Sequence, residues 1–119
     1  MRLLLLSSAD PHSTASVQVA YFTVEHGPEG VVVRWGTLVE ERTSHFRVLR
    51  GVTRTQQEAV DIGRVTSLGS GSGDYQLLDP DAPARRMYYW LVVVECDGTE
   101  NVYGPVLNGA QLFVPLVQR

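Results

Sequence analysis

The chain has 119 residues, of which 44% are hydrophobic and 19% charged, a balance typical of one globular domain and not of a disordered chain. Its net charge of -3 gives no electrostatic basis for binding nucleic acid. No apolar run approaches the roughly 20 residues of a membrane-spanning helix, so we expect no transmembrane segment. The single cysteine, Cys96, excludes an internal disulfide.

Residues 1–16 contain an apolar segment in which Leu3, Leu4, Leu5 and Leu6 follow Arg2. This run is shorter than the apolar region of a signal peptide, which has roughly 7–15 residues. We therefore interpret 1–16 as an ordered N-terminal arm. Its four leucines are the candidate assembly arm, because an extended segment can add a strand to a neighbouring subunit.

Short apolar segments separated by turn residues follow the arm, a spacing typical of all-β sandwiches. The polar stretch 55–60 predicts one helical turn, and the glycine-rich stretch 69–73 predicts a flexible loop. The strands predicted in this part of the chain are 17–25, 31–35, 46–50, 62–68 and 74–79, the last ended by Pro80.

The segment 86–96 is almost entirely aromatic or β-branched and predicts a long strand that is apolar on both faces. Asp97-Gly98 predicts a hairpin that leads into a partner strand at 100–107. Asn108-Gly109 is a second hairpin signal, so 111–114 is expected to fold back as another strand within a C-terminal tail, 108–119.

These elements predict an antiparallel Greek-key β-sandwich of seven to nine strands over residues 17–107. Alternation within strands assigns one face of each to the core. The predicted core residues are Phe22, Val31, Val33, Trp35, Phe46, Val48, Leu77, Tyr88, Trp90, Val92 and Val94.

The order of several motifs resembles a fibronectin type III-like module of the kind found in bacterial secreted and cell-surface proteins. The motifs are Val31 to Trp35, Phe46 to Arg50, Ile62-Gly63, the loop 70–73, Tyr75 to Asp79, Tyr88 to Leu91 and Tyr103-Gly104-Pro105. The resemblance implies an immunoglobulin-like sandwich with Trp35 in its core. It also implies that Tyr88 is a corner tyrosine whose hydroxyl bonds to upstream backbone. An extracellular or cell-surface location follows from the resemblance alone.

The surface left outside the predicted core has the composition of a protein interface. Arg47 and Leu49 are expected to point outward beside Tyr89, Leu91 and Val93. We therefore expect a non-enzymatic interaction, spacer or accessory-subunit module that binds a protein partner or itself. The alternative is that the chain's own apolar ends cover this surface.

Other chemistry finds less support in the residues. The three histidines have no paired spacing for a metal, and the sequence has no nucleophile motif, so we expect no enzyme activity, metal or cofactor. A carbohydrate-binding module is the alternative function, with Tyr75, Tyr103, Asp79 and Asn101 as candidate sugar contacts.

Overall fold

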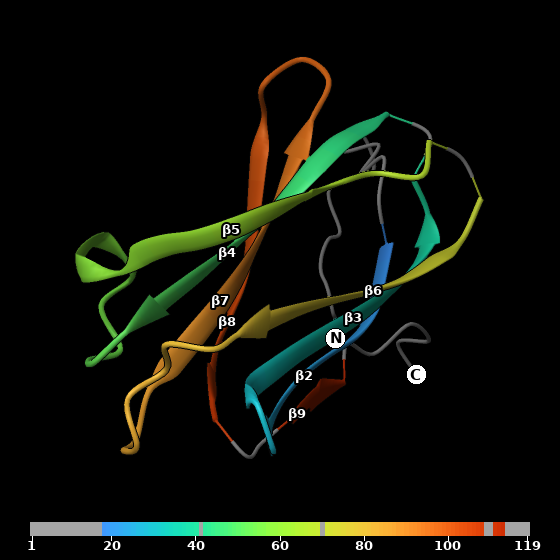
Figure 1. Cartoon of the computed structure of the whole chain (residues 1–119). Helices are drawn as coiled ribbons and strands as arrows, with labels where there is room; N and C mark the ends of the chain where they lie inside the picture. The colour runs from blue at the N-terminus through green and yellow to red at the C-terminus, as the bar shows by residue number, and fades with distance from the viewer. Residues whose placement is uncertain (1–17, 41, 70, 109–110, 114–119) are drawn as a thin grey trace.

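The computed structural model describes residues 18–40, 42–69, 71–108 and 111–113, and in this part of the chain the fold is all-β (Figure 1). The predicted arm with Leu3 to Leu6, the hairpin residue Gly109 and the chain after Phe113 lie outside the described residues. The elements are β2 (Gln18–Gly27), β3 (Gly30–Val39), β4 (Thr43–Gly51), the 3-10 helix η1 (Gln56–Glu58), β5 (Val60–Thr66), β6 (Gly73–Asp79), β7 (Tyr88–Glu95), β8 (Glu100–Leu107) and β9 (Gln111–Phe113).

Two antiparallel sheets pack face to face. One has the strand order β6-β3-β2, extended at its edge by the three-residue β9, and the other has the order β5-β4-β7-β8. The chain passes from the β2–β3 hairpin to the β4–β5 hairpin in the second sheet, returns to the first for β6, and crosses again for β7 and β8. The predicted strands, the helical turn and the Asp97-Gly98 hairpin are confirmed.

The partner of β9 differs from the prediction. Residues 111–113 do not pair with β8. They pair instead with β2 in the other sheet, where Tyr21 lies opposite Phe113. An Asn-Gly pair indicates a local reversal of direction, and it does not determine which sheet edge receives the next segment.

The core lies between the sheets and is centred on three aromatic rings. Trp35 stacks on Tyr75 with ring centroids 5.6 Å apart, and Phe46 packs against both, 5.5 Å from Trp35 and 4.7 Å from Tyr75. The buried aliphatic and aromatic side chains around them come from both sheets: Val19, Phe22, Val24, Val31, Val33, Val48, Met87, Tyr89, Leu91, Val93 and Val106.

The assignment of Tyr88, Trp90, Val92 and Val94 to this core is wrong. Val93 pairs with Phe46 and Leu91 with Val48, and directly paired residues share a face of a sheet. The odd-numbered residues of β7 therefore face the other sheet, and the even-numbered ones face outward. Alternation alone cannot orient a strand that is apolar on both sides, whereas its neighbour β4 alternates clearly.

Tyr89, and not Tyr88, ties the end of β6 to β7. Its hydroxyl donates to Asp79 Oδ2 at 2.8 Å. Arg50 Nη1 also donates to this carboxylate and lies 2.9 Å from each of its two oxygens. Burial, followed by the hydrogen bond to Asp79, raises the pKa of Tyr89 well above its ordinary value. The role expected for Tyr88 is therefore wrong: Tyr88 lies on the outer face, and the buried hydroxyl contact is made by Tyr89 to a side chain and not to backbone.

A second buried polar group, the Glu40 carboxylate, holds the β5–β6 connection. It accepts hydrogen bonds from the Tyr75 hydroxyl and the Ser67 hydroxyl, each at 2.5 Å, and from the Thr37 hydroxyl. Burial alone would raise the pKa of Glu40, but these hydroxyls and the Leu68 N–H outweigh it and lower the pKa. The carboxylate is thus held ionised by neutral donors.

Candidate functional site

The outer face of the β5-β4-β7-β8 sheet carries a second apolar cluster, separate from the core. Leu49, Trp90, Val92 and Val94 pack together there, with Tyr88 partly buried against them. Val92 is 0% exposed and Trp90 2%, although neither lies between the two sheets. Other side chains on this outer face therefore shield Trp90 and Val92 from solvent.

Arg47 provides cover over the middle of the cluster. Its side chain lies on the same face as Val92, its paired residue on β7. The guanidinium contacts Asp61 on β5 at 3.2 Å and Glu100 on β8 at 3.6 Å. Because these acids stand on the two edge strands, the guanidinium extends over the sheet between them. Its Nε is buried without a hydrogen-bond partner among the described residues, as expected of a stem that lies on apolar surface.

The other end of the cluster is built around Trp90. A Cβ added at Gly51 would stand 3.2 Å from the indole and 3.4 Å from the Ala59 side chain, so the ring fits against a strand position without a side chain. Arg54 lies over the Tyr88 ring, 5.7 Å from its centroid, in a cation–π arrangement. Two arginines, a tryptophan and a tyrosine therefore share this face.

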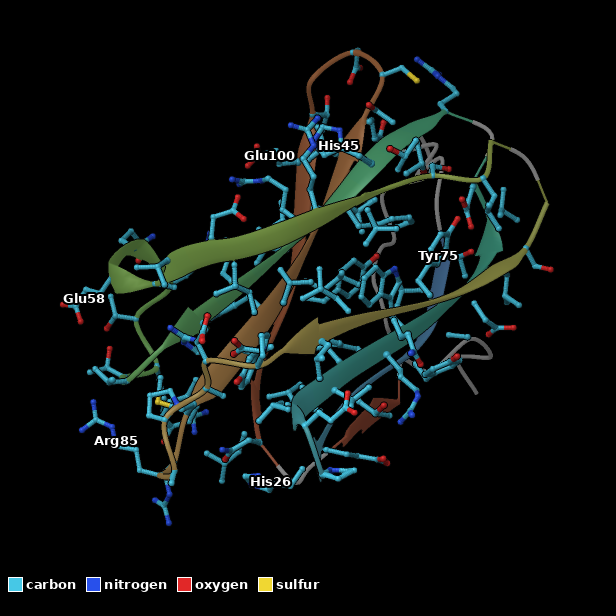
Figure 2. The ribbon with its side chains drawn as sticks, viewed as in Figure 1. His26, His45, Glu58, Tyr75, Arg85 and Glu100 are labelled. Carbon is cyan, nitrogen blue, oxygen red and sulfur yellow. The ribbon has the colours of Figure 1, made fainter. Side chains whose placement is uncertain are left out.

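The charges on this face are mixed. Glu100 and His45 lie at the same end of the sheet (Figure 2), and the positive charges of Arg64 and Arg47 act on the same histidine. Burial, followed by these two arginines, lowers the pKa of His45 below its ordinary value. The lowered pKa favours the neutral form of His45. The charged groups on this face are Arg47, Arg54 and Arg64 together with Asp61 and Glu100, so both signs of charge are present.

The predicted interface residues lie in two different places, the outer face of one sheet and the interior between the two sheets. Arg47 and Leu49 lie on the outer face, as predicted, but Tyr89, Leu91 and Val93 are fully buried between the sheets. The prediction of an exposed surface made of the latter three is wrong. The sequence analysis missed Trp90 and Val92 on this face, and the signal that identifies them is their pairing with Leu49 and Arg47.

The predicted sugar contacts do not form one exposed surface. Tyr75, labelled in Figure 2, is buried against Trp35 and bonds to Glu40, while Asp79 is buried against Arg50. Tyr103 is half-buried against the core and Asn101 donates to Glu95 at 3.0 Å. A sugar platform made of these four residues is therefore wrong.

Within the described ranges, no group of three or more His, Cys, Asp or Glu side chains is arranged to hold a metal ion. No helix in the same part of the chain is long and apolar enough to cross a bilayer. The sequence matches no family model, and neither a curated protein nor a solved structure matches it.

Proposed function

We propose that this chain is a non-enzymatic module that binds another protein chain through the outer face of the β5-β4-β7-β8 sheet, as a spacer or accessory subunit of a larger assembly. The observation that carries the proposal is the gathering of Trp90, Tyr88, Arg47 and Arg54 on one face outside the core. Tryptophan, tyrosine and arginine are the residue types that contribute most to the binding energy of protein interfaces.

The buried ionisable groups favour a binding role over catalysis. Asp79 is bonded to Arg50 and Tyr89, and Glu40 to three hydroxyls, so each carboxylate already serves the packing of strands. A general acid or base needs free access to a substrate proton. Neither carboxylate is placed for that role.

We also propose that the two sheets form a Greek-key sandwich of the fibronectin type III-like kind. The strand order β6-β3-β2 against β5-β4-β7-β8 supports this assignment. An extracellular or cell-surface location rests on that resemblance.

The partner that fits this face best is a second copy of the chain. A two-fold interface requires a surface complementary to itself. The outer face carries Arg64 and Asp61 on β5 and Glu100 on β8, so it presents both signs of charge. Like charges are therefore not forced to oppose one another when two such faces meet.

Light scattering of the full chain over a wide range of concentration tests the proposal. Val102, on this face and 42% exposed, is changed to Glu; the control is Leu78→Glu, 41% exposed on the outer face of the other sheet. The proposal predicts a dimer that Val102→Glu dissociates and Leu78→Glu does not. A wild-type monomer at every concentration, or dissociation by both variants alike, would contradict self-association through this face.

A further inference from the structure

The outer face of the other sheet, β6-β3-β2-β9, carries an aromatic ring laid across a strand. Tyr21 on β2, Gly36 on β3 and Asp74 on β6 stand in one row by register. The Tyr21 hydroxyl donates to Asp74 Oδ1 at 2.8 Å, so the side chain crosses β3 to reach it. A Cβ at Gly36 would stand only 2.2 Å from the Tyr21 ring. Glycine at position 36 is what permits the ring to lie down on the sheet.

The next row of the same face is polar and ordered. Arg34 Nε donates to Gln76 Oε1 at 3.3 Å, and Arg34 Nη1 contacts Glu25 at 3.2 Å. The Arg34 and Glu25 side chains remain 44% and 60% exposed. Each group retains unused hydrogen-bonding atoms, because an amide, a guanidinium and a carboxylate have more donor or acceptor positions than these bonds occupy.

The edge strand β9 completes this sheet. It pairs with β2, with position 113 directly opposite Tyr21.

We propose that the outer face of β6-β3-β2-β9 binds a neutral saccharide, with one pyranose ring seated on Tyr21. The apolar C–H face of a pyranose packs on an aromatic ring, and its hydroxyls bond to planar amide, guanidinium and carboxylate groups. Asp74, Gln76 and Arg34 supply these groups beside the ring. The two carboxylates Asp74 and Glu25 outnumber the one guanidinium, which favours a neutral ligand over a polyanion.

The site is independent of the proposed protein interface, because it lies on the opposite outer face of the sandwich. It also differs from the sugar contacts expected from the sequence, none of which lies on this surface. A failure of one proposal therefore leaves the other standing, and the two experiments report on different faces.

Native gel electrophoresis in gels that contain a soluble neutral polysaccharide tests the proposal, with hydroxyethylcellulose, xylan and galactomannan as the probes. The wild-type chain should be retarded in at least one gel. Tyr21→Ala should weaken that affinity about tenfold, equivalent to about 1.4 kcal/mol. Tyr21→Phe, which keeps the ring, should bind, and Leu68→Ala, at an exposed position in the connection between β5 and β6, is the control.

Circular dichroism establishes whether Tyr21→Ala folds. If it does not, Gln76→Ala decides, since this exposed side chain can be removed without opening the core, and it too should reduce retardation. The absence of retardation in all three gels overturns the proposal. So does retardation that persists undiminished in the folded Tyr21→Ala or, failing that, in Gln76→Ala, because a ring that only shields the Gly36 backbone would bind no sugar.

Discussion

Glu40 provides the sharpest test of how this fold is held together. The residue is 0% exposed, and its carboxylate joins the β3–β4 connection to Ser67, Thr37 and Tyr75. Glu40→Ala removes the acceptor from all three hydroxyls at once. Each hydroxyl keeps a backbone donor, since Leu68 N–H donates to Tyr75, Gly69 N–H to Ser67 and Gly73 N–H to Thr37. The variant therefore leaves the Tyr75 and Ser67 hydroxyl protons without an acceptor, whereas the Thr37 hydroxyl retains the Gly73 carbonyl at 3.3 Å.

The size of the effect follows from these three bonds. A hydrogen bond to a charged group contributes at least about 1.5 kcal/mol, so the three together contribute about 4–5 kcal/mol. The variant also relieves the desolvation of a buried carboxylate, which offsets part of this sum. We expect Glu40→Ala to lower the free energy of unfolding by about 3 kcal/mol, a large share of the 5–15 kcal/mol typical of a domain.

Urea unfolding followed by tryptophan fluorescence measures this loss, because Trp35 and Trp90 are both buried. The midpoint should fall while the dependence on urea stays the same, which indicates a change in stability and not in the compactness of the end states. Ser67→Ala, which removes one of the three donors, is the matched control and should cost about 1.5 kcal/mol. A loss below about 1 kcal/mol for Glu40→Ala would refute the argument that the carboxylate organises this connection.

The lowered pKa of Glu40 adds a dependence on pH. Its folded pKa lies below the ordinary value of 4.5, so the folded state prefers the ionised carboxylate. That contribution to stability is complete above pH 4.5 and is lost as the pH falls through the folded pKa. Glu40→Gln carries no such proton, so its stability should vary less than that of the wild type across this acidic range. Equal slopes for the two proteins would exclude Glu40 as the titrating group.

Substitutions at Tyr89 and at Arg47 test the sheet contacts, with Tyr88→Phe as a control for the first. Tyr89→Phe removes the hydroxyl that donates to the buried Asp79 and should lower stability by about 1–3 kcal/mol in urea unfolding, whereas Tyr88→Phe, at a half-buried outer position, should change it little. Equal effects would mean that position 88 also makes a buried contact. Arg47→Met keeps an apolar stem over Val92 and should stay within about 0.5 kcal/mol of the wild type, because its ion pairs are partly exposed. Arg47→Ala uncovers the cluster and should cost about 1 kcal/mol, and equal losses for Met and Ala would assign the effect to charge instead of cover.

Strand positions were predictable from the sequence because local chemistry sets them. β8 spans the predicted residues 100–107, and the Asp97 side chain accepts the Thr99 N–H in the turn that precedes it. Side-chain oxygens and glycine impose such turns within a few residues. The pairing of strands that are distant in sequence is different. β9 pairs with β2 and not with β8, and no residue near 111–113 indicates that pairing.

The candidate interface was predictable only in part for the same reason. Arg47 and Leu49 sit on β4, whose alternation is clear, and both lie on the outer face as predicted. β7 is apolar at every position from 88 to 94, so its orientation depends on its partner strand and not on its own pattern. Pairing the two strands before assigning faces would have placed Trp90 beside Leu49.

An outer face covered by arginine differs from one covered by packed aliphatic side chains. The Arg47 stem shields Val92, while its guanidinium contacts two acids that are themselves partly exposed, so the side chain can be moved aside at small electrostatic cost. In the proposed interface, Arg47 keeps a single copy soluble by covering the apolar base. A partner chain that displaces the Arg47 side chain would then contact the apolar surface of Trp90 and Val92. The displaced guanidinium could itself contact that partner. The strand with two apolar faces thus contributes to the core on one side and, in the proposed interface, to association on the other.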